Sequence, residues 1–223
     1  PVLTEDPCKA ASSKPWSAAK AFMIMVADHS IILILATLIG GYILGSIPFG
    51  LVLTRLAGLG DIRKIGSGNI GATNVLRTGN KFLALLTLIL DIGKGAAAVL
   101  VAEYFYPGLG LYAGGGAFLG HLYSIFLKFT GGKGVATFLG IMIALNPLSG
   151  LACCATWLIS ALLFRISSLS ALIAALSSPL FGYYFSEINL AILASILCIL
   201  ILLKHKENIK RLLAGTEPRI GKK

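Results

Sequence analysis

Long apolar segments, separated by short polar ones, make up nearly all of the chain after residue 30. Seven such segments occupy residues 31–57, 81–106, 109–129, 135–145, 148–164, 169–185 and 188–203. A helix of about 20 apolar residues crosses the ~30 Å hydrocarbon core of a bilayer. The pattern predicts an all-α fold, a polytopic membrane helix bundle with about seven transmembrane helices. Because the fourth to sixth segments are short, five or six spans stay open as alternatives.

The composition agrees with a membrane protein and leaves no room for a separate soluble domain. Of the 223 residues, 57% are hydrophobic and only 13% are charged, whereas soluble domains are about a quarter charged. Residues 28–223 are expected to form one integral-membrane domain. Residues 1–27 lack the charged, apolar and cleavage regions of a signal peptide, so we interpret them as an N-terminal extension or a remnant of cloning.

Basic residues gather on one side of the predicted bundle. That side holds Arg55, Arg63, Lys64, Arg77, Lys81, Lys128, Lys133, Arg165 and every base from Lys204 onward. The opposite side holds Asp28, Glu103 and Glu187, with no base after Lys20. The positive-inside rule then predicts an external N-terminus and a cytoplasmic C-terminus. These bases at the membrane boundary account for the net charge of +10, so the charge does not indicate a nucleic-acid partner.

Residues 64–77, Lys-Ile-Gly-Ser-Gly-Asn-Ile-Gly-Ala-Thr-Asn-Val-Leu-Arg, form a polar loop on the predicted cytoplasmic side. Glycines let backbone N–H groups turn toward an anion, while hydroxyl and amide side chains add donors and flanking bases add charge. The loop therefore favours phosphate binding over a flexible helix linker, although linkers are also rich in such residues. Its candidate substrate-binding or catalytic residues are Gly66, Ser67, Gly68, Asn69, Thr73, Asn74 and Arg77.

Three further polar segments fall on the same side. Lys133 lies between Gly132 and Gly134, so its ammonium can approach a phosphate closely, although interfacial lysines are common on cytoplasmic loops. His205 and Asn208 are i, i+3 neighbours in the basic tail, which could instead hold anionic lipid headgroups. Ser168, in the turn after Arg165, could bind a ligand or simply cap the next helix.

Other chemistries are missing from the sequence. There is no Gly-x-Ser-x-Gly elbow or His-Glu-x-x-His motif, and the three histidines and four cysteines show no metal-ligand spacing, so neither a metal nor a cofactor is expected. Asp91 and Lys94 are predicted to pair inside the bundle, and His121 to be an interior histidine. A site rich in donors and poor in bases suits a substrate whose leaving group is already activated.

Four motifs, in this order, resemble the bacterial acyl-phosphate:glycerol-3-phosphate acyltransferases, the PlsY family. They are Gly-Ser-Ile-Pro-Phe-Gly at 45–50, the segment 61–74, Gly-Gly-Lys-Gly-Val-Ala-Thr at 131–137 and His-Lys-Glu-Asn-Ile-Lys-Arg-Leu-Leu at 205–213. The resemblance extends over about residues 31–217. One departure is Ser124, which stands where the family pattern has a proline, so the resemblance does not predict a bend at this position; the active site is unaffected.

The resemblance implies an enzyme that transfers a fatty acyl chain from acyl phosphate to the 1-hydroxyl of glycerol 3-phosphate, giving lysophosphatidic acid and phosphate. It also implies a monomer in the bacterial inner membrane with its site on the cytoplasmic face. Ser67, Gly68 and Asn69 would hold the acyl phosphate. The glycerol 3-phosphate would be held by Arg77, Lys133, Ser168, His205 and Asn208. Ser67, Lys133 and His205 are the catalytic candidates, with His205 or a substrate phosphate oxygen as the base.

A transporter or channel for a small phosphorylated anion is the alternative. Glycine-broken helices and intramembrane charges are also typical of transporters. The polar loops, however, gather on one face rather than at the bilayer midplane, and no inverted repeat is visible in the sequence. These two features favour the acyltransferase.

Overall fold

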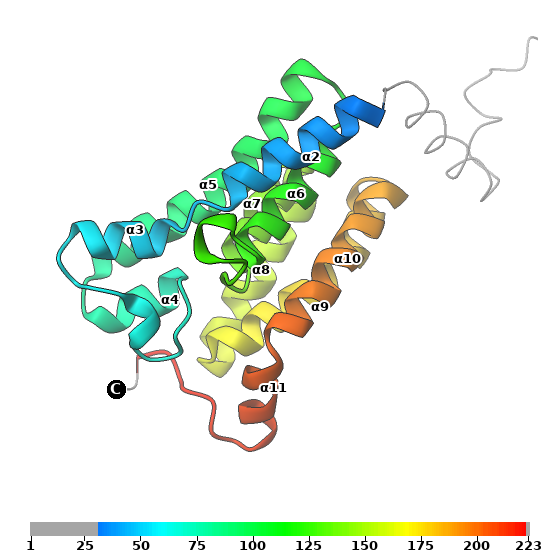
Figure 1. The fold of residues 1–223 in the computed structure, drawn as a ribbon. Coiled ribbons are helices and arrows are strands. Elements are labelled where there is room, and N and C mark those ends of the chain that lie inside the picture. Colours follow the sequence, from blue (N-terminus) through cyan, green and yellow to red (C-terminus); the bar gives the residue numbers. More distant parts are fainter. Residues whose placement is uncertain (1–30, 222–223) are drawn as a thin grey trace, which may run out of the picture.

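The computed structural model describes residues 31–221 (Figure 1), so the predictions for residues 1–27 lie outside the described residues. The long helices are α2 (Ile31–Gly45), α5 (Lys81–Phe105), α6 (Gly110–Leu122), α7 (Val135–Leu145), α8 (Pro147–Phe164), α9 (Ser167–Phe185) and α10 (Ile188–Lys204). Shorter helices are α3 (Phe49–Leu56), α4 (Ala72–Val75) and α11 (Lys206–Leu213), with 3-10 turns η1 (Ile62–Lys64), η2 (Leu76–Thr78) and η3 (Ile125–Leu127). The described residues contain no strand, and the predicted all-α fold is confirmed.

Every predicted apolar segment contains a helix, but not all are long enough to cross a bilayer alone. Four stretches qualify by length and composition, namely Ile31–Leu56, α5, α8 and α9. A fifth is reached if α10 and α11, which meet at a bend of 66°, count as one span. Helices α6 and α7 have 13 and 11 residues, about 20 and 16 Å at 1.5 Å per residue. The chain is therefore a multi-pass membrane protein.

The third apolar segment, expected to be helical over residues 109–129, ends as a helix at Leu122. The turn η3 follows it, and Lys128 and Phe129 have left-handed backbone angles that no helix can contain. Ser124 has a φ of −62°, the value that proline imposes, so the chain bends here even without the proline. The Ser124 hydroxyl donates to the carbonyl of Ser46 at 2.6 Å and so connects this turn to the end of α2.

Helices α2 and α6 pack backbone against backbone. A Cβ atom at Gly41 would lie 2.1 Å from the carbonyl oxygen of Ala113, and one at Gly120 would lie 2.1 Å from that of Tyr42. Gly45 and Gly116 make equally close approaches along the same interface. Small residues spaced four apart allow such contact between membrane helices, where van der Waals packing replaces the hydrophobic effect. The interface fixes α6, whose last turn leads into the functional site.

The central helix of the bundle is α7. Phe138, Ile141 and Met142 are fully buried on it, and it packs against α5 and α8. Leu197 and Ile201 of α10 belong to the same core cluster. The polar loop that contains α4 lies at the same end of the bundle as α11 and the segment after it (Figure 1). Segments far apart in sequence thus meet at one end of the molecule.

Gly41→Ala is expected to destabilise the protein by about 1–3 kcal/mol, because the added methyl group overpacks the α2–α6 interface. Gly40→Ala is the matched control: a Cβ there has no neighbour within 4 Å, so it should be neutral or stabilise by up to about 1 kcal/mol through helix propensity. Thermal unfolding in detergent measures both. Equal unfolding temperatures for the two variants would contradict the close packing.

Candidate active site

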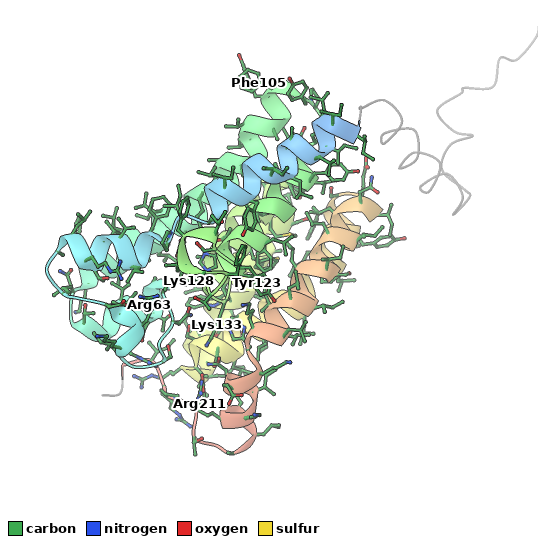
Figure 2. All side chains as sticks on the ribbon, viewed as in Figure 1. Arg63, Phe105, Tyr123, Lys128, Lys133 and Arg211 are labelled. Carbon is green, nitrogen blue, oxygen red and sulfur yellow. The ribbon has the colours of Figure 1, made fainter. Side chains whose placement is uncertain are left out.

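A cavity of about 400 Å³ opens where the polar loop, the Gly-Gly-Lys-Gly loop, α9 and α11 meet. The sequence-predicted residues that line it are Ser67, Asn69, Thr73, Asn74, Arg77, Lys133, Gly134, Ser168, His205 and Asn208. Gly66, Gly68 and Gly132 belong to the same loops but do not line the cavity. In Figure 2, Lys133 and Arg211 lie toward the end of the bundle opposite Phe105. The structure therefore brings the four predicted polar segments together.

Asn74 organises the loop 64–77 from within. Its side-chain NH2 group donates to the carbonyls of Ile62 at 2.8 Å, Ile65 at 3.0 Å and Asn69 at 2.8 Å. Its Oδ1 accepts a hydrogen bond from the backbone N–H of Ser67 at 3.2 Å. Because the residue is only 2% exposed and its donors are used by the loop, Asn74 shapes the loop. The direct substrate contact predicted for it stays a prediction.

The left-handed glycines of this loop are required by its close contacts. Gly66 has a φ of +55°, and a Cβ there would lie 2.5 Å from Nη1 of Arg77. Gly68 has a φ of +69° and turns the loop back before Asn69. Asn69 accepts a hydrogen bond from the N–H of Ile70 through Oδ1 at 2.9 Å. Within the described residues no acceptor is bonded to the Asn69 NH2 group, which therefore remains a donor for a ligand at the cavity wall.

Across the cavity, one carboxylate connects several candidate residues. Oε1 of Glu217 accepts hydrogen bonds from the Ser168 hydroxyl and the Asn208 amide, each at 2.6 Å, and Oε2 accepts one from Nε of Arg211 at 2.6 Å. Asn208 in turn accepts a hydrogen bond from Nζ of Lys133. The glycine loop, α9, α11 and the segment after α11 are thereby joined in a single network.

Electrostatics in this half of the cavity favour an anionic ligand. Burial lowers the pKa of Lys133, and the charges of Arg211 and Arg77 lower it further, while Glu217 opposes the shift. Burial acts to raise the pKa of Glu217, but its hydrogen bonds with Ser168, Asn208 and Arg211 together hold that pKa below the ordinary value. Glu217 is therefore ionised, and Arg77, which also lines the cavity, has no carboxylate partner among the described residues.

His205 is held as a neutral imidazole. It is 2% exposed, and its Nδ1 lies 2.8 Å from the carbonyl of Ile201, an acceptor that requires the proton on Nδ1. The remaining nitrogen, Nε2, is then an acceptor. Burial, assisted by the nearby charge of Lys133, lowers the pKa of His205 to about 4. The side chain lines the cavity and so can accept a hydrogen bond from a substrate hydroxyl at neutral pH.

Several residues at the cavity were missed by the sequence-based prediction. Polar ones are Asp91, His121, Ser167, Arg211 and Glu217, and apolar ones include Leu88, Ile92, Leu139, Trp157 and Leu158. Arg211 and Glu217 lie in the basic tail beside the predicted His205 and Asn208, which was the available signal. The apolar residues carry no such signal, since they are indistinguishable in sequence from the other membrane-embedded positions.

Comparison with known proteins decides the family. The family model described as glycerol-3-phosphate acyltransferase matches residues 35–215. The chain belongs to the glycerol-3-phosphate acyltransferase family. Among curated acyltransferases of that name, the Mesorhizobium japonicum protein is 59% identical over 191 residues, covering 86% of this chain and 97% of the relative. The Brucella canis protein is 56% identical, with coverages of 86% and 95%.

Two crystal structures of PlsY, an integral membrane glycerol 3-phosphate acyltransferase, are similar to this acyltransferase family member over most of its length. The glycerol 3-phosphate form has a TM-score of 0.79 at 39% identity and covers 84% of this chain and 96% of PlsY. The lysophosphatidic acid form has a TM-score of 0.77 at 38% identity, with coverages of 84% and 95%. The predicted resemblance to the PlsY family is confirmed.

The neutral, buried His205 predicts that the acyltransferase loses stability in mild acid. The pKa of this imidazole is about 4 in the folded state and about 6.5 in an unfolded chain, so the unfolded state binds more protons between these values. Stability should therefore fall as the pH drops from 7 to 5. His205→Gln should weaken that fall, whereas Lys210→Gln, at an exposed site, should not. Identical slopes of unfolding temperature against pH in all three proteins would contradict the assignment.

Proposed function

We propose that this chain transfers a fatty acyl group from an acyl phosphate to the 1-hydroxyl of glycerol 3-phosphate, releasing lysophosphatidic acid and inorganic phosphate. The observation that carries the proposal is one cavity with a donor-rich, basic side and an apolar side. Both reactants carry phosphate, and one also carries a long apolar chain. The PlsY structures, in glycerol 3-phosphate and lysophosphatidic acid forms, support the acceptor and the product.

In this proposal the two phosphates bind in one cavity, between the wall formed by the loop 64–77 and the wall formed by α9 and α11. Ser67, Gly68 and Asn69, with the loop amides, hold the acyl phosphate. Gly66 and Asn74 keep that loop in shape, and Thr73, which lines the cavity beside Ser167, adds a hydroxyl for substrate. Arg77, Lys133, Ser168, His205 and Asn208 bind glycerol 3-phosphate, with Gly132 and Gly134 allowing Lys133 to approach. Attack of the glycerol hydroxyl on the acyl carbonyl carbon forms the new ester bond and expels phosphate. Lys133, between the two walls, neutralises the negative charge that develops.

The hydroxyl proton has two possible acceptors, and the pKa values favour one of them. His205 has a neutral Nε2 at the cavity, but its pKa of about 4 makes it a weak base. A phosphate monoester has a second pKa near 6, so it is the stronger base at neutral pH. We therefore assign proton acceptance to a substrate phosphate oxygen and hydroxyl orientation to His205. No cofactor or metal is needed, because an acyl phosphate is already activated.

The apolar side of the cavity suits the acyl chain. Leu88 and Ile92 of α5 line it together with Trp157 and Leu158 of α8. Leu158 is 54% exposed on a helix long enough to cross the membrane, so this wall reaches the lipid-facing surface. The acyl chain would enter from the bilayer without crossing water.

We further propose seven spans in the bacterial inner membrane, an external N-terminus, a cytoplasmic site and a monomeric enzyme. Lys133 and Arg211 lie toward the end of the bundle opposite Phe105 (Figure 2), which with the positive-inside rule supports the orientation.

The decisive experiment supplies acyl phosphate and glycerol 3-phosphate to the detergent-purified protein. Phosphate release should require both substrates, and mass spectrometry should find lysophosphatidic acid in equal amount. Absence of product, together with glycerol 3-phosphate flux into protein-containing vesicles, would instead establish a transporter.

Lys133→Ala should lower turnover by about 10²–10³-fold, as expected for loss of a group that stabilises developing charge. Lys210→Ala is the control, because Lys210 is exposed and pairs only with exposed Glu207; its turnover should match that of the unmodified protein. Circular dichroism and unfolding temperature would verify that both variants fold. Near-normal turnover in Lys133→Ala would remove this residue from the reaction.

The orientation can be tested with single cysteines in intact cells of a bacterial host. Ser186→Cys, in the exposed turn between α9 and α10, should react with a membrane-impermeant maleimide added outside. Lys210→Cys, on α11, should react only after permeabilisation. The reverse labelling pattern would invert the proposed topology.

A further inference from the structure

A buried polar cluster lies between the cavity and the centre of the bundle. Asp91 and Lys94 of α5 form the predicted ion pair at 2.8 Å, and Nδ1 of His121, from the last turn of α6, lies 3.7 Å from Oδ1 of Asp91. The three residues are 2%, 3% and 4% exposed. Asp91 and His121 also line the cavity, whereas Lys94 does not. The reaction proposed above uses none of them.

The cluster is in direct contact with the loop that carries Lys133. The backbone N–H of Gly132 donates to the carbonyl of His121 at 3.0 Å. A Cβ at Gly131 would lie 2.2 Å from the same carbonyl oxygen, and one at Gly132 would lie 2.2 Å from the His121 ring nitrogen Nε2. Gly131 therefore packs directly against the backbone of His121, and Gly132 packs directly against its ring. The position of the ring determines where the next residue, Lys133, can be.

The other side of the cluster reaches the phosphate-binding loop through α3. Nζ of Lys94 donates to the carbonyl of Ile47, in the break between α2 and α3, at 2.8 Å. On α3, a Cβ at Gly50 would lie only 2.0 Å from the carbonyl oxygen of Ile70, within the loop 64–77. A continuous series of contacts thus connects both anion-binding loops to one ion pair.

We propose that Asp91 and His121 are positioning residues that fix the location of Lys133 in the cavity. Asp91, paired with Lys94, lies 3.7 Å from Nδ1 of His121, too far for a hydrogen bond, and confines the imidazole by packing against it. The backbone of His121 supports Gly131, and its imidazole supports Gly132. The inference rests on the proposed function, in which Lys133 contacts substrate. The position of the Lys133 side chain, however, can be measured without assaying turnover. The competing explanation is a cluster that only stabilises the bundle, without effect on the glycine loop.

The first test measures the location of Lys133 directly. Folded protein is treated briefly with acetic anhydride, and mass spectrometry gives the acetylation rate of each lysine. Lys133, held against Asn208, should react several-fold faster in Asp91→Asn and His121→Ala than in the unmodified protein, with Lys210 as the internal reference. If His121→Ala does not fold, His121→Gln provides the same comparison. An unchanged Lys133 rate in folded variants would overturn the proposal whatever reaction the protein catalyses.

The second test is a double-mutant cycle on turnover. Gly132→Ala alone should lower kcat at least tenfold, because its methyl group meets the His121 ring. In Gly132→Ala combined with His121→Ala the methyl group has space, so the double variant should be no slower than His121→Ala. His121→Ala and His121→Gln should each raise the KM for glycerol 3-phosphate more than the KM for acyl phosphate. Losses that multiply independently, or a fall in unfolding temperature with unchanged kinetics, would show that the cluster is structural only.

Discussion

The hydrogen bond from Lys133 to Asn208 joins the two halves of the site, and the rest of the cavity is arranged around it. A cation removed from water must be compensated by polar partners, or its desolvation is too costly. Here the compensation passes through Asn208 to the carboxylate of Glu217, which also binds Ser168 and Arg211. Removing that carboxylate would release three side chains from one arrangement, because all of them converge on its two oxygens.

The position of this network depends on the apolar packing of the helices that carry it. The glycine contacts between α2 and α6 fix the last turn of α6, and this turn presents the His121 carbonyl to Gly132. Membrane helices have little hydrophobic driving force between them, so the close approach of small residues performs the role that a core performs in a soluble protein. The densely packed helix pair therefore supports the glycine loop, and the residues proposed to bind substrate lie on that loop, on the loop 64–77 and on α9 and α11.

Much of this arrangement could be predicted from the sequence. Apolar length located every long helix, and the loops around Ser67 and Lys133 were recognised by their glycines and donors. The predicted end of the third apolar helix was wrong: residues 123–129 are largely apolar, like the helix before them, but Lys128 and Phe129 have left-handed backbone angles. Ser124 in this turn also makes a tertiary hydrogen bond to Ser46, which hydropathy does not report. The number of spans is likewise not readable from hydropathy alone, because α6 and α7 are short.

Within the site, residues were predictable when their own segment carried a signal and not when their role depends on another segment. Asn74 looks in sequence like one more donor, yet it points into its loop and bonds three carbonyls there. Asp91 and His121 were predicted from the sequence to be interior residues. The cavity that they line is formed by elements distant from them in sequence. The spacing of residues along the chain does not predict such contacts between distant segments.

The exposed Leu158 at the edge of the cavity has a consequence for how the proposed reaction ends. In the proposed reaction the two products would separate by solubility: the single-chain lipid would leave through the apolar side into the bilayer, and the inorganic phosphate would leave through the polar side into water. Re-encounter of the pair is rare in such an arrangement. The architecture itself thus discourages the reverse reaction, with no moving gate required.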